Sequence, residues 1–531
     1  MEIGRGSDLD TAWNQGIQRL RLWLRRQKLP PRWLRVDAVS EVRQMHWKDL
    51  KRQFARTKTN YFKWGVSWDS GFQVALLEQE LNGTSCLYTG DITACTPDDH
   101  NVRRLLHRRF GVDQGWPSVD TERIWIFRTR AVFSDGRETM ELEHEGNMAG
   151  VRKTGELDAQ QVLDLVSRST GYLCRQVRAD GRWHYGWAPA FDKPLASYNA
   201  LRHASSAYAL LEGWELTRNP EHLDAADRAL DYMCRELIRE IRLTDGRTVS
   251  YLVDVGNEIK LGGNAVALLA LAKHATLTGD IGRLPLMESL ALGLLAMQDP
   301  KTGGFVHVLE YPSLALKEKT RTIYYDGEAA FGLLRLYDLT RDRRWLNAVQ
   351  QAIDHFIAAE HCKAHDHWLG YCIAEFTRHV PEEKYFRFGI RNVREHLDFV
   401  LTRITTYPTL LELMMAAESM FETMRTREDL RGLLERELDT EKFRRALHYR
   451  AHYLLNGYFF PELAMFFKAP NKIVGSFFIR HYGFRVRIDD VQHYLSGYVA
   501  YWRHLQATER QGAQALPARR HLSLDTSNGA A

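Results

Sequence analysis

Three stretches of this sequence share one pattern at a nearly constant spacing. Each opens on polar residues, continues through small and apolar residues, and ends in Leu-Thr. The closing threonines, Thr217, Thr278 and Thr340, lie about 61 residues apart. A fixed period predicts a fold made of repeated supersecondary units, each of which buries its apolar face against its neighbours.

From residue 158 onward the sequence alternates between two kinds of helix. We expect amphipathic outer helices at 158–177, 221–241, 282–298, 343–360, 382–401 and 430–455. We expect inner helices, rich in small residues, at 198–216, 261–278, 325–340, 367–378, 405–423 and 489–505. Short turns follow the first three inner helices, whereas longer loops precede the inner helices. The longer loops therefore gather on one rim, where a functional site belongs.

Six hairpins are the number that closes a ring, so we predict a mainly α protein with an (α/α)6 toroid over 158–505. An open solenoid would need polar terminal caps. The last inner helix instead carries aromatic residues like the others, among them Tyr494, Tyr498 and Trp502. This favours closure.

The residues on either side of the toroid differ from it in composition. Residues 1–36 predict a basic helix with a Trp/Leu stripe, which we interpret as docked by that stripe; a membrane-surface or partner helix is the alternative. Residues 37–150 predict a small α+β domain, with a short helix at Val39–Arg56 and strand-like aromatic segments after it. Residues 506–531 are polar, and we expect a disordered tail.

Composition limits the classes of function. The chain has 531 residues, 44% of them apolar, and its 72 basic and 67 acidic side chains leave a net charge of +5. This balance argues against nucleic acid as a partner. No apolar run reaches the roughly 20 residues of a spanning helix, and the first residues lack the apolar core of a signal peptide. The six cysteines form no CxxC pair, so we expect reduced thiols and a cytoplasmic location.

Familiar cofactor and metal motifs are missing from the sequence. It contains no GxxxxGK[ST], GxSxG, HExxH or zinc-finger spacing. His361, Cys362 and His365 have donor atoms that suit a metal, but they lie in one short loop, and a tetrahedral site more usually draws on separate segments. We therefore expect neither a metal nor a cofactor.

Polar residues at the heads of the inner helices are the candidates for chemistry, because these heads converge on the mouth of the ring. The first group shares one side of a helix and combines a proton-transferring histidine with an anion-binding arginine; it consists of Tyr198, Asn199, Arg202 and His203. The second pairs carboxylates with a tyrosine, in Tyr325, Asp326 and Glu328. Such residues also simply cap helices.

Two further groups complete the candidates. His367 and Trp368 stand at the head of the fourth inner helix and suit contacts with a substrate. The C-terminal block, residues 477–493, holds charged residues among aromatic ones: Arg480, His481, Arg485, Arg487, Asp489, Asp490 and His493. There the aspartates and His481 would serve as acid or base and the arginines would hold an anionic group, unless the block is a buried ion-pair network that closes the ring.

Residues 158–505 resemble the six-hairpin toroid enzymes, which include the N-acylglucosamine and cellobiose 2-epimerases, many glycoside hydrolases and several polysaccharide lyases. The resemblance rests on the architecture and on phrases such as YDGEAAFGLLRLYDLTRDRRWLNAVQQA, residues 325–352. The Arg202-His203 pair on the first inner helix is similar to the epimerases. The resemblance implies a carbohydrate substrate, which the arginines would suit if it is anionic.

These observations leave three functions open. The first is a cytoplasmic sugar epimerase or isomerase, in which His203 acts with His481 or His367 as acid and base. The second is a glycoside hydrolase, with Asp326 or Glu328 facing Asp489 or Asp490, or a lyase on the same fold. The third is a non-catalytic glycan- or partner-binding protein of polysaccharide or cell-envelope biosynthesis, with the N-terminal domain as the surface for a protein partner.

Overall fold

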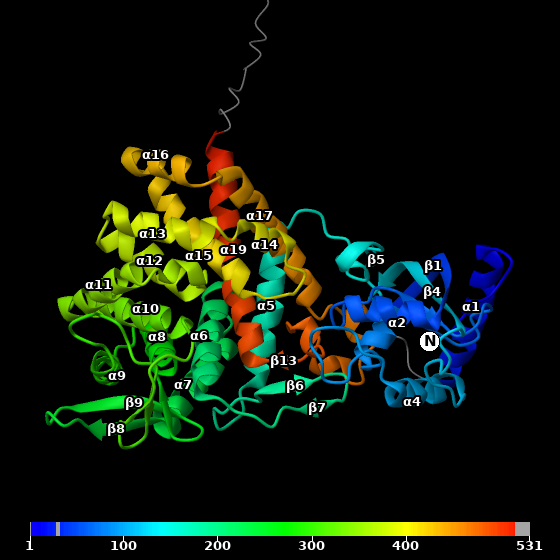
Figure 1. Ribbon diagram of the computed structural model, residues 1–531, viewed down its shortest axis with the longest axis horizontal. Helices are drawn as coiled ribbons and strands as arrows, with labels where there is room; N and C mark the ends of the chain where they lie inside the picture. Colours follow the sequence, from blue (N-terminus) through cyan, green and yellow to red (C-terminus); the bar gives the residue numbers. More distant parts are fainter. Residues whose placement is uncertain (1, 28–31, 516–531) are drawn as a thin grey trace, which may run out of the picture.

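The computed structural model describes residues 2–27 and 32–515 and the side chains up to residue 510. Six inner helices form a ring at the centre of the larger part of the molecule (Figure 1). They are α6 (Ala200–Thr217), α8 (Leu261–Thr278), α10 (Tyr324–Thr340), α12 (His367–His379), α15 (Thr409–Arg425) and α19 (Ile488–Ala515). Each packs against the next, and α19 packs against α6. The predicted six-hairpin (α/α)6 toroid is therefore confirmed.

The outer helices pack on the outside of this ring. They are α5 (Ala159–Gln176), α7 (Pro220–Tyr232), α9 (Leu284–Ala296), α11 (Arg343–Ala358), α13 (Glu383–Arg394) with α14 (Leu397–Thr402), and α17 (Thr440–Tyr453) with α16 (Glu428–Glu437). Amphipathic helices belong in such an outer layer, because one face packs on the ring and the other meets water.

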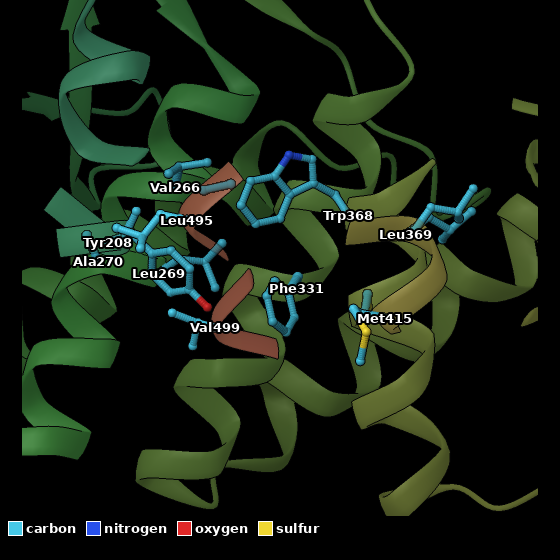
Figure 2. Close-up of a cluster of buried hydrophobic side chains, with 14 of the residues drawn as sticks. Tyr208, Val266, Leu269, Ala270, Phe331, Trp368, Leu369, Met415, Leu495 and Val499 are labelled. Atoms are coloured by element: carbon cyan, nitrogen blue, oxygen red, sulfur yellow. The ribbon is translucent and has the colours of Figure 1, made fainter. Parts of the chain in front are cut away.

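Apolar side chains from all six inner helices meet inside the ring. Figure 2 shows Tyr208 of α6, Leu269 of α8, Phe331 of α10, Trp368 of α12, Met415 of α15 and Val499 of α19. All six are buried. The inner helices are apolar on nearly every side because they are covered by the outer layer and by one another.

The Leu-Thr turns end the first three inner helices in the same way. Arg218, Gly279 and Arg341 follow the threonines with φ of 50°, 78° and 57°, and their N–H groups bond back to the helix. The hydroxyls of Thr278 and Thr340 donate to carbonyls four residues earlier. This left-handed cap reverses the chain in few residues, which explains the short turns of the repeat.

Two small sheets replace loops on the opposite rim. The strands β8 (Ile238–Arg242), β9 (Thr248–Asp254), β10 (Glu258–Lys260), β11 (Val308–Glu310) and β12 (Leu316–Glu318) form one antiparallel sheet. A second joins β6 (Gly186–Ala188), β7 (Lys193–Pro194) and β13 (Val486–Arg487). The outer helix predicted at 221–241 was therefore wrong beyond residue 237, because that segment turns into β8.

The N-terminal part is an α+β unit with its own core. Its strands are β1 (Leu34–His46), β2 (Gly65–Ser67), β3 (Ala75–Leu76), β4 (Arg123–Ser134) and β5 (Thr139–Glu141), ordered β1-β4-β2-β3 with β5 beside β4. Its helices are α1 (Leu9–Gln27), α2 (Trp47–Arg56), α3 (Glu78–Gly83) and α4 (Asp99–Phe110). Aromatic rings such as Trp47 and Trp116, stacked 5.3 Å apart, fill the core.

Two predictions at the ends of the chain need correction. The helix expected at Val39–Arg56 begins only at Trp47, because the preceding residues pair with β4 as strand β1. The tail expected to be disordered from residue 506 is helical to Ala515, because α19 continues; residues 516–531 lie outside the described part. The positions of the domain boundaries stay a prediction.

Among the described helices, none combines the length and the apolarity that crossing a bilayer requires. The short helix α18 (Pro461–Ala464) lies between α17 and α19 in the last hairpin.

Candidate functional site

Three side chains meet where the heads of α12, α15 and α19 converge. The Nδ1 atom of His493 lies 2.7 Å from Oε2 of Glu412, and Nε2 of His367 lies 3.7 Å from the same oxygen. The two imidazole rings are 5.2 Å apart, edge to face. We call these three residues the mouth trio.

The mouth trio is buried on one side and open on the other. His367 and Glu412 are almost fully buried, whereas 22% of the His493 side chain is exposed. Nε2 of His367 and Oε1 of Glu412 have no hydrogen-bond partner among the described residues. Buried polar atoms are normally paired, so these two atoms are available to a ligand that enters beside His493.

The surroundings shift the pKa values of the two histidines in opposite directions. Burial, and then the charge of His493, lowers the pKa of His367 well below its ordinary value. Burial also opposes a charge on His493, but the neighbouring Glu412 carboxylate outweighs it, and the pKa of His493 is raised. Burial raises the pKa of Glu412 against the attraction of His493. The surroundings thus favour the neutral form of His367 and the protonated form of His493.

An ion-pair network lies one helical turn before His493. Asp489 accepts from Arg202 of α6 at 2.8 Å, and Arg487 donates to both oxygens of Asp490, at 3.0 and 2.7 Å. Burial and the charge of Asp490 raise the pKa of Asp489. Asp489 and His493 are four residues apart and share one face of α19. The network therefore joins the first and last inner helices next to the mouth trio.

Aromatic side chains flank the mouth trio. The ring of Tyr324, with 40% of the residue exposed, meets His367 edge to face at 5.3 Å. Trp368 is buried behind it, 6.5 Å from His493. An apolar wall with a few converging polar groups is typical of small-molecule sites.

His203 lies away from this site. Its Nδ1 pairs with the hydroxyl of Tyr198 at 2.7 Å, and its Nε2 pairs with the carbonyl of Ala229 on the outer helix α7 at 2.8 Å. Burial lowers the pKa of His203 to about 4. With both ring nitrogens bonded, His203 and Tyr198 tie the first hairpin together, and the structure does not bring them to the mouth.

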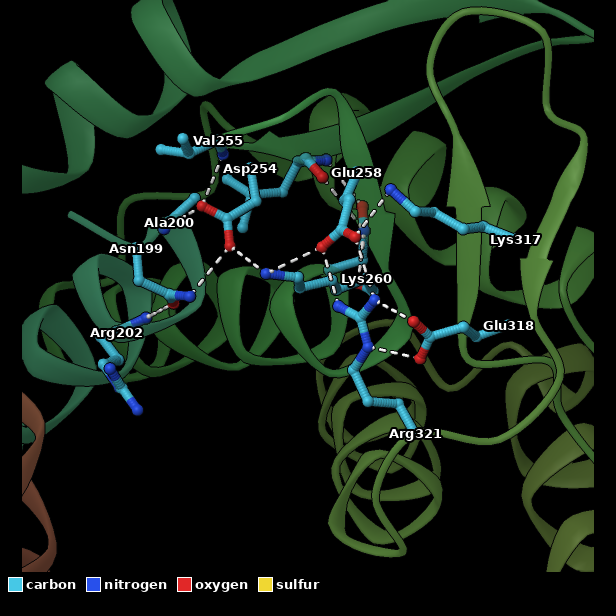
Figure 3. A network of polar contacts seen from close by, with 12 residues as sticks. Asn199, Ala200, Arg202, Asp254, Val255, Glu258, Lys260, Lys317, Glu318 and Arg321 are labelled. Atoms are coloured by element: carbon cyan, nitrogen blue, oxygen red, sulfur yellow. Dashed lines mark hydrogen bonds and ion pairs between the residues drawn. The ribbon is translucent and has the colours of Figure 1, made fainter. Parts of the chain in front are cut away.

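Asn199 caps α6 and joins a separate polar network (Figure 3). Its amide donates to Asp254 at 2.9 Å, and Lys260 donates to the same carboxylate at 2.7 Å. Arg321 in turn binds Glu258 through two N–H groups. This network fixes the small sheet against the heads of α6 and α8, so Asn199 positions the rim.

The residues at the head of α10 are divided. Asp326 contacts His307 at 3.1 Å, and the ring of Tyr325 lies 5.5 Å from the same histidine. Glu328 is buried, its Oε2 has no hydrogen-bond partner among the described residues, and burial raises its pKa well above the ordinary value. A Cβ on Gly262 would stand 1.9 Å from this oxygen. Gly262 thus allows α8 to approach α10 closely.

Arg480 and His481 lie at the junction with the N-terminal part. Arg480 is buried and donates to the carbonyl and side-chain oxygens of Asn456, and its own carbonyl accepts from Asn60 at 2.8 Å. His481 is 3.2 Å from the hydroxyl of Tyr407, and burial lowers its pKa to about 4. These contacts hold the two parts of the molecule together.

The structure therefore gathers six of the predicted residues near one another and adds Glu412 and His493. The six are Arg202, His367, Trp368, Arg487, Asp489 and Asp490. Glu412 was missed as a site residue, and His493 was named in the C-terminal block without a role. Both residues lie near the heads of inner helices, where polar residues were expected to converge. The fifth inner helix was expected from residue 405 but begins at Thr409, so Glu412 was taken for a residue in the middle of the helix.

The described residues also contain two groups with metal-ligand chemistry. The donor atoms of the mouth trio lie within 4.8 Å of one another, as do those of Glu418, Glu422 and His504. The loop histidines do not assemble in this way: His365 pairs with the carbonyl of Asn392 at 2.8 Å.

No protein-family model matches this chain, and no curated protein matches it in sequence. Solved structures match in fold. A D-mannose isomerase aligns over 67% of this chain and 100% of its own, with a TM-score of 0.50 and 10% identity. The cellobiose 2-epimerase of Spirochaeta thermophila covers 66% of this chain and 98% of its own (TM-score 0.49, 14% identity). The GH76 alpha-mannanase of Bacteroides thetaiotaomicron covers the same shares (TM-score 0.46, 11% identity). At 10% identity, the match to the isomerase shows the fold alone.

Proposed function

We propose that this protein is a sugar epimerase or isomerase that moves a proton at a carbon next to a carbonyl. The observation that carries the proposal is the mouth trio, in which two imidazole rings lie 5.2 Å apart and their surroundings shift the two pKa values in opposite directions. Two titratable groups with pKa values driven apart by their surroundings are the usual sign of an acid/base pair.

Each member of the mouth trio has a role in this chemistry. His367 is neutral with a free Nε2, so it takes the proton from the carbon. His493 keeps its proton because of Glu412, so it donates one to the substrate and completes the transfer. Glu412 is a positioning residue, which holds His493 in place and charged.

Other residues of the mouth would bind the sugar. Arg202 is one-third exposed and already balanced by Asp489, which suits hydrogen bonds to hydroxyls. Tyr324 offers an exposed ring against which a sugar face can pack. For an anionic substrate, Arg202 and Arg487 are the arginines that would bind the charged group. Arg480 would not, because it is buried at the junction with the N-terminal part. A cytoplasmic location is part of the proposal as well, since all six cysteines are free thiols.

The hydrolase alternative has less support. A hydrolase needs two free carboxyl groups across the bond. Asp326 contacts His307, and Glu328 is buried where α8 approaches α10. Asp489 and Asp490 are held by Arg202 and Arg487. A glycan-binding role without catalysis would not require the pKa values of the two histidines to be shifted in opposite directions.

The experiment is incubation of the full-length protein in D2O with a panel of reducing aldoses and disaccharides that includes D-mannose. Proton NMR follows the signal of the C2 hydrogen. We expect one member of the panel to lose this signal and to form its epimer or ketose. Release of monosaccharide from a disaccharide or mannan, without deuterium at C2, would replace this proposal with the hydrolase. If neither reaction occurs, the non-catalytic binding function is the one that fits.

A further inference from the structure

The N-terminal helix α1 has an apolar face that belongs to no hydrophobic core of the described residues. Trp13, Ile17, Leu20 and Leu24 recur at the three- and four-residue spacing of one helical face, and Trp23 lies beside them. Trp13 is 47% exposed and Trp23 45%, whereas Ile17, Leu20 and Leu24 are half-buried. Isolated exposed apolar residues are ordinary, but two exposed tryptophans on the borders of one apolar face point to a contact surface.

α1 is set apart from the rest of the molecule. Figure 1 places it at the far end of the N-terminal part, away from the ring. None of its residues belongs to a hydrophobic core of the described chain, and it packs extensively against no other described helix or strand. Asp8 caps its start by accepting from the N–H of Thr11 at 2.8 Å, so the helix is stabilised locally. The apolar face of α1 is therefore not used for packing within the described residues.

The charges of α1 identify the chemistry of that partner. The helix carries four arginines and a single aspartate, Asp10. On the helical wheel, Arg19 and Arg21 flank the apolar stripe on its two sides. In residues 2–27 and 32–515, Arg21, Arg25 and Arg26 have no carboxylate partner. Positive charge on both borders of a Trp/Leu stripe is the pattern of helices that lie in the surface of an anionic bilayer.

We propose that α1 docks this protein onto an anionic lipid surface, with Trp13 and Trp23 inserted at the headgroup level and the arginines against lipid phosphates. Tryptophan is favoured at that depth, since its ring has an apolar body and a polar N–H. A second copy of the chain fits less well, because pairing the stripes would bring the arginines of both copies together. The N-terminal part is joined to the ring through Asn60 and Arg480, so the docked helix would hold the whole enzyme at the surface.

The test is co-sedimentation of the full-length protein with extruded vesicles. One set contains phosphatidylcholine alone and the other phosphatidylcholine with phosphatidylglycerol. We expect binding to the anionic vesicles only, and a decline as salt is raised. Replacing Arg21→Glu and Arg25→Glu together should weaken binding at least about tenfold, as each basic residue near such a surface contributes about fivefold.

A pair of variants separates insertion from simple charge attraction. The double variant Trp13→Ala and Trp23→Ala should also bind anionic vesicles at least about tenfold more weakly. Leu22 is exposed on the opposite side of α1, so the matched control Leu22→Ala should bind as the wild type does. Equal binding to both vesicle types, or to neither, would overturn the proposal. Binding that survives the tryptophan changes and is lost only with the arginines would overturn the insertion of the tryptophans in favour of attraction by charge alone. Concentration-dependent dimers that disappear in the tryptophan variant would overturn the proposal in favour of a second copy.

Discussion

Glu412 is the carboxylate that contacts both histidines of the mouth trio, at 2.7 Å from His493 and 3.7 Å from His367. Burial alone would lower the pKa of His493; Glu412 is the largest of the contributions that raise it, and the charges of Asp489 and Asp490 add to it. The acid form of His493 is present below its raised pKa and is lost as pH rises through it; the base form of His367 is present above its lowered pKa. We therefore expect an activity plateau around neutral pH that falls on the alkaline side as His493 loses its proton.

Glu412→Gln should move that alkaline limb to lower pH. With the carboxylate gone, burial lowers the pKa of His493, and the rate at pH 8 should fall by about a hundredfold, within the range for one acid/base group. Part of the rate should return at pH 6. The pH dependence of kcat/KM checks this. Glu418→Gln, on the same helix and paired with Arg425, is the control; if both variants lose activity equally at every pH, Glu412 has only a structural role.

At the scale of the helix, the distance between α8 and α10 depends on one glycine. A Cβ at Gly262 would lie 1.9 Å from Oε2 of Glu328 and 2.4 Å from the ring of Tyr325. Gly262→Ala should therefore destabilise the protein by about 1–3 kcal/mol, as overpacking does. At Gly263 the nearest atom is 3.3 Å away, in the side chain of Leu252. Gly263→Ala is the matched control, and urea unfolding compares the two; equal effects would mean that helix propensity, rather than the contact with α10, sets the cost.

The helices themselves could be predicted from the sequence because of their composition. The inner helix at 261–278 has the same bounds in the structure, since small and apolar residues between a polar head and a Leu-Thr turn leave few alternatives. The side of an inner helix that faces the mouth could not be predicted. Such a helix is buried all round, so no polar face marks its orientation, and His203 was assigned to the mouth although it faces α7. The strands β8 and β9 pair with each other across a short turn, and this hairpin was missed because residues 221–241 were interpreted as one outer helix.

At the scale of the molecule, the side chain of Arg480 links the ring to the N-terminal part, because its guanidinium lies 5.7 Å from the ring of Tyr61. Arg480→Ala would remove this contact and the N–H donors to Asn456, whose own amide donates to the carbonyl of Asn147. We expect a loss of about 2–4 kcal/mol, as for other buried charged hydrogen bonds that are broken, and faster trypsin cleavage between the two parts. Arg178→Ala, which removes an exposed pair with Asp180, should change stability by less than about 0.5 kcal/mol. Thermal unfolding with limited proteolysis measures both; an unchanged Arg480→Ala protein would mean that the parts are joined elsewhere.

Ring closure is what brings residues from distant parts of the sequence into one mouth. α19 returns to α6, where Asp489 meets Arg202 and Ser496 donates to Glu212 at 2.6 Å. The count of six hairpins could be predicted from the period of the sequence. The pairing of His493 with Glu412 could not, because it depends on where α15 begins relative to α19.

The most direct test of the account is the rate at which deuterium from D2O enters C2 of the substrate found in the sugar panel. It is measured by NMR for the wild type and for His367→Asn, His493→Asn and His203→Asn, each corrected for the folded fraction. We predict that the rate of deuterium incorporation falls at least about a hundredfold in the first two variants. The His203→Asn protein should be less stable, but its rate of deuterium incorporation should stay within about threefold of the wild-type rate. Exchange that persists without His493 and disappears without His203 would contradict the account.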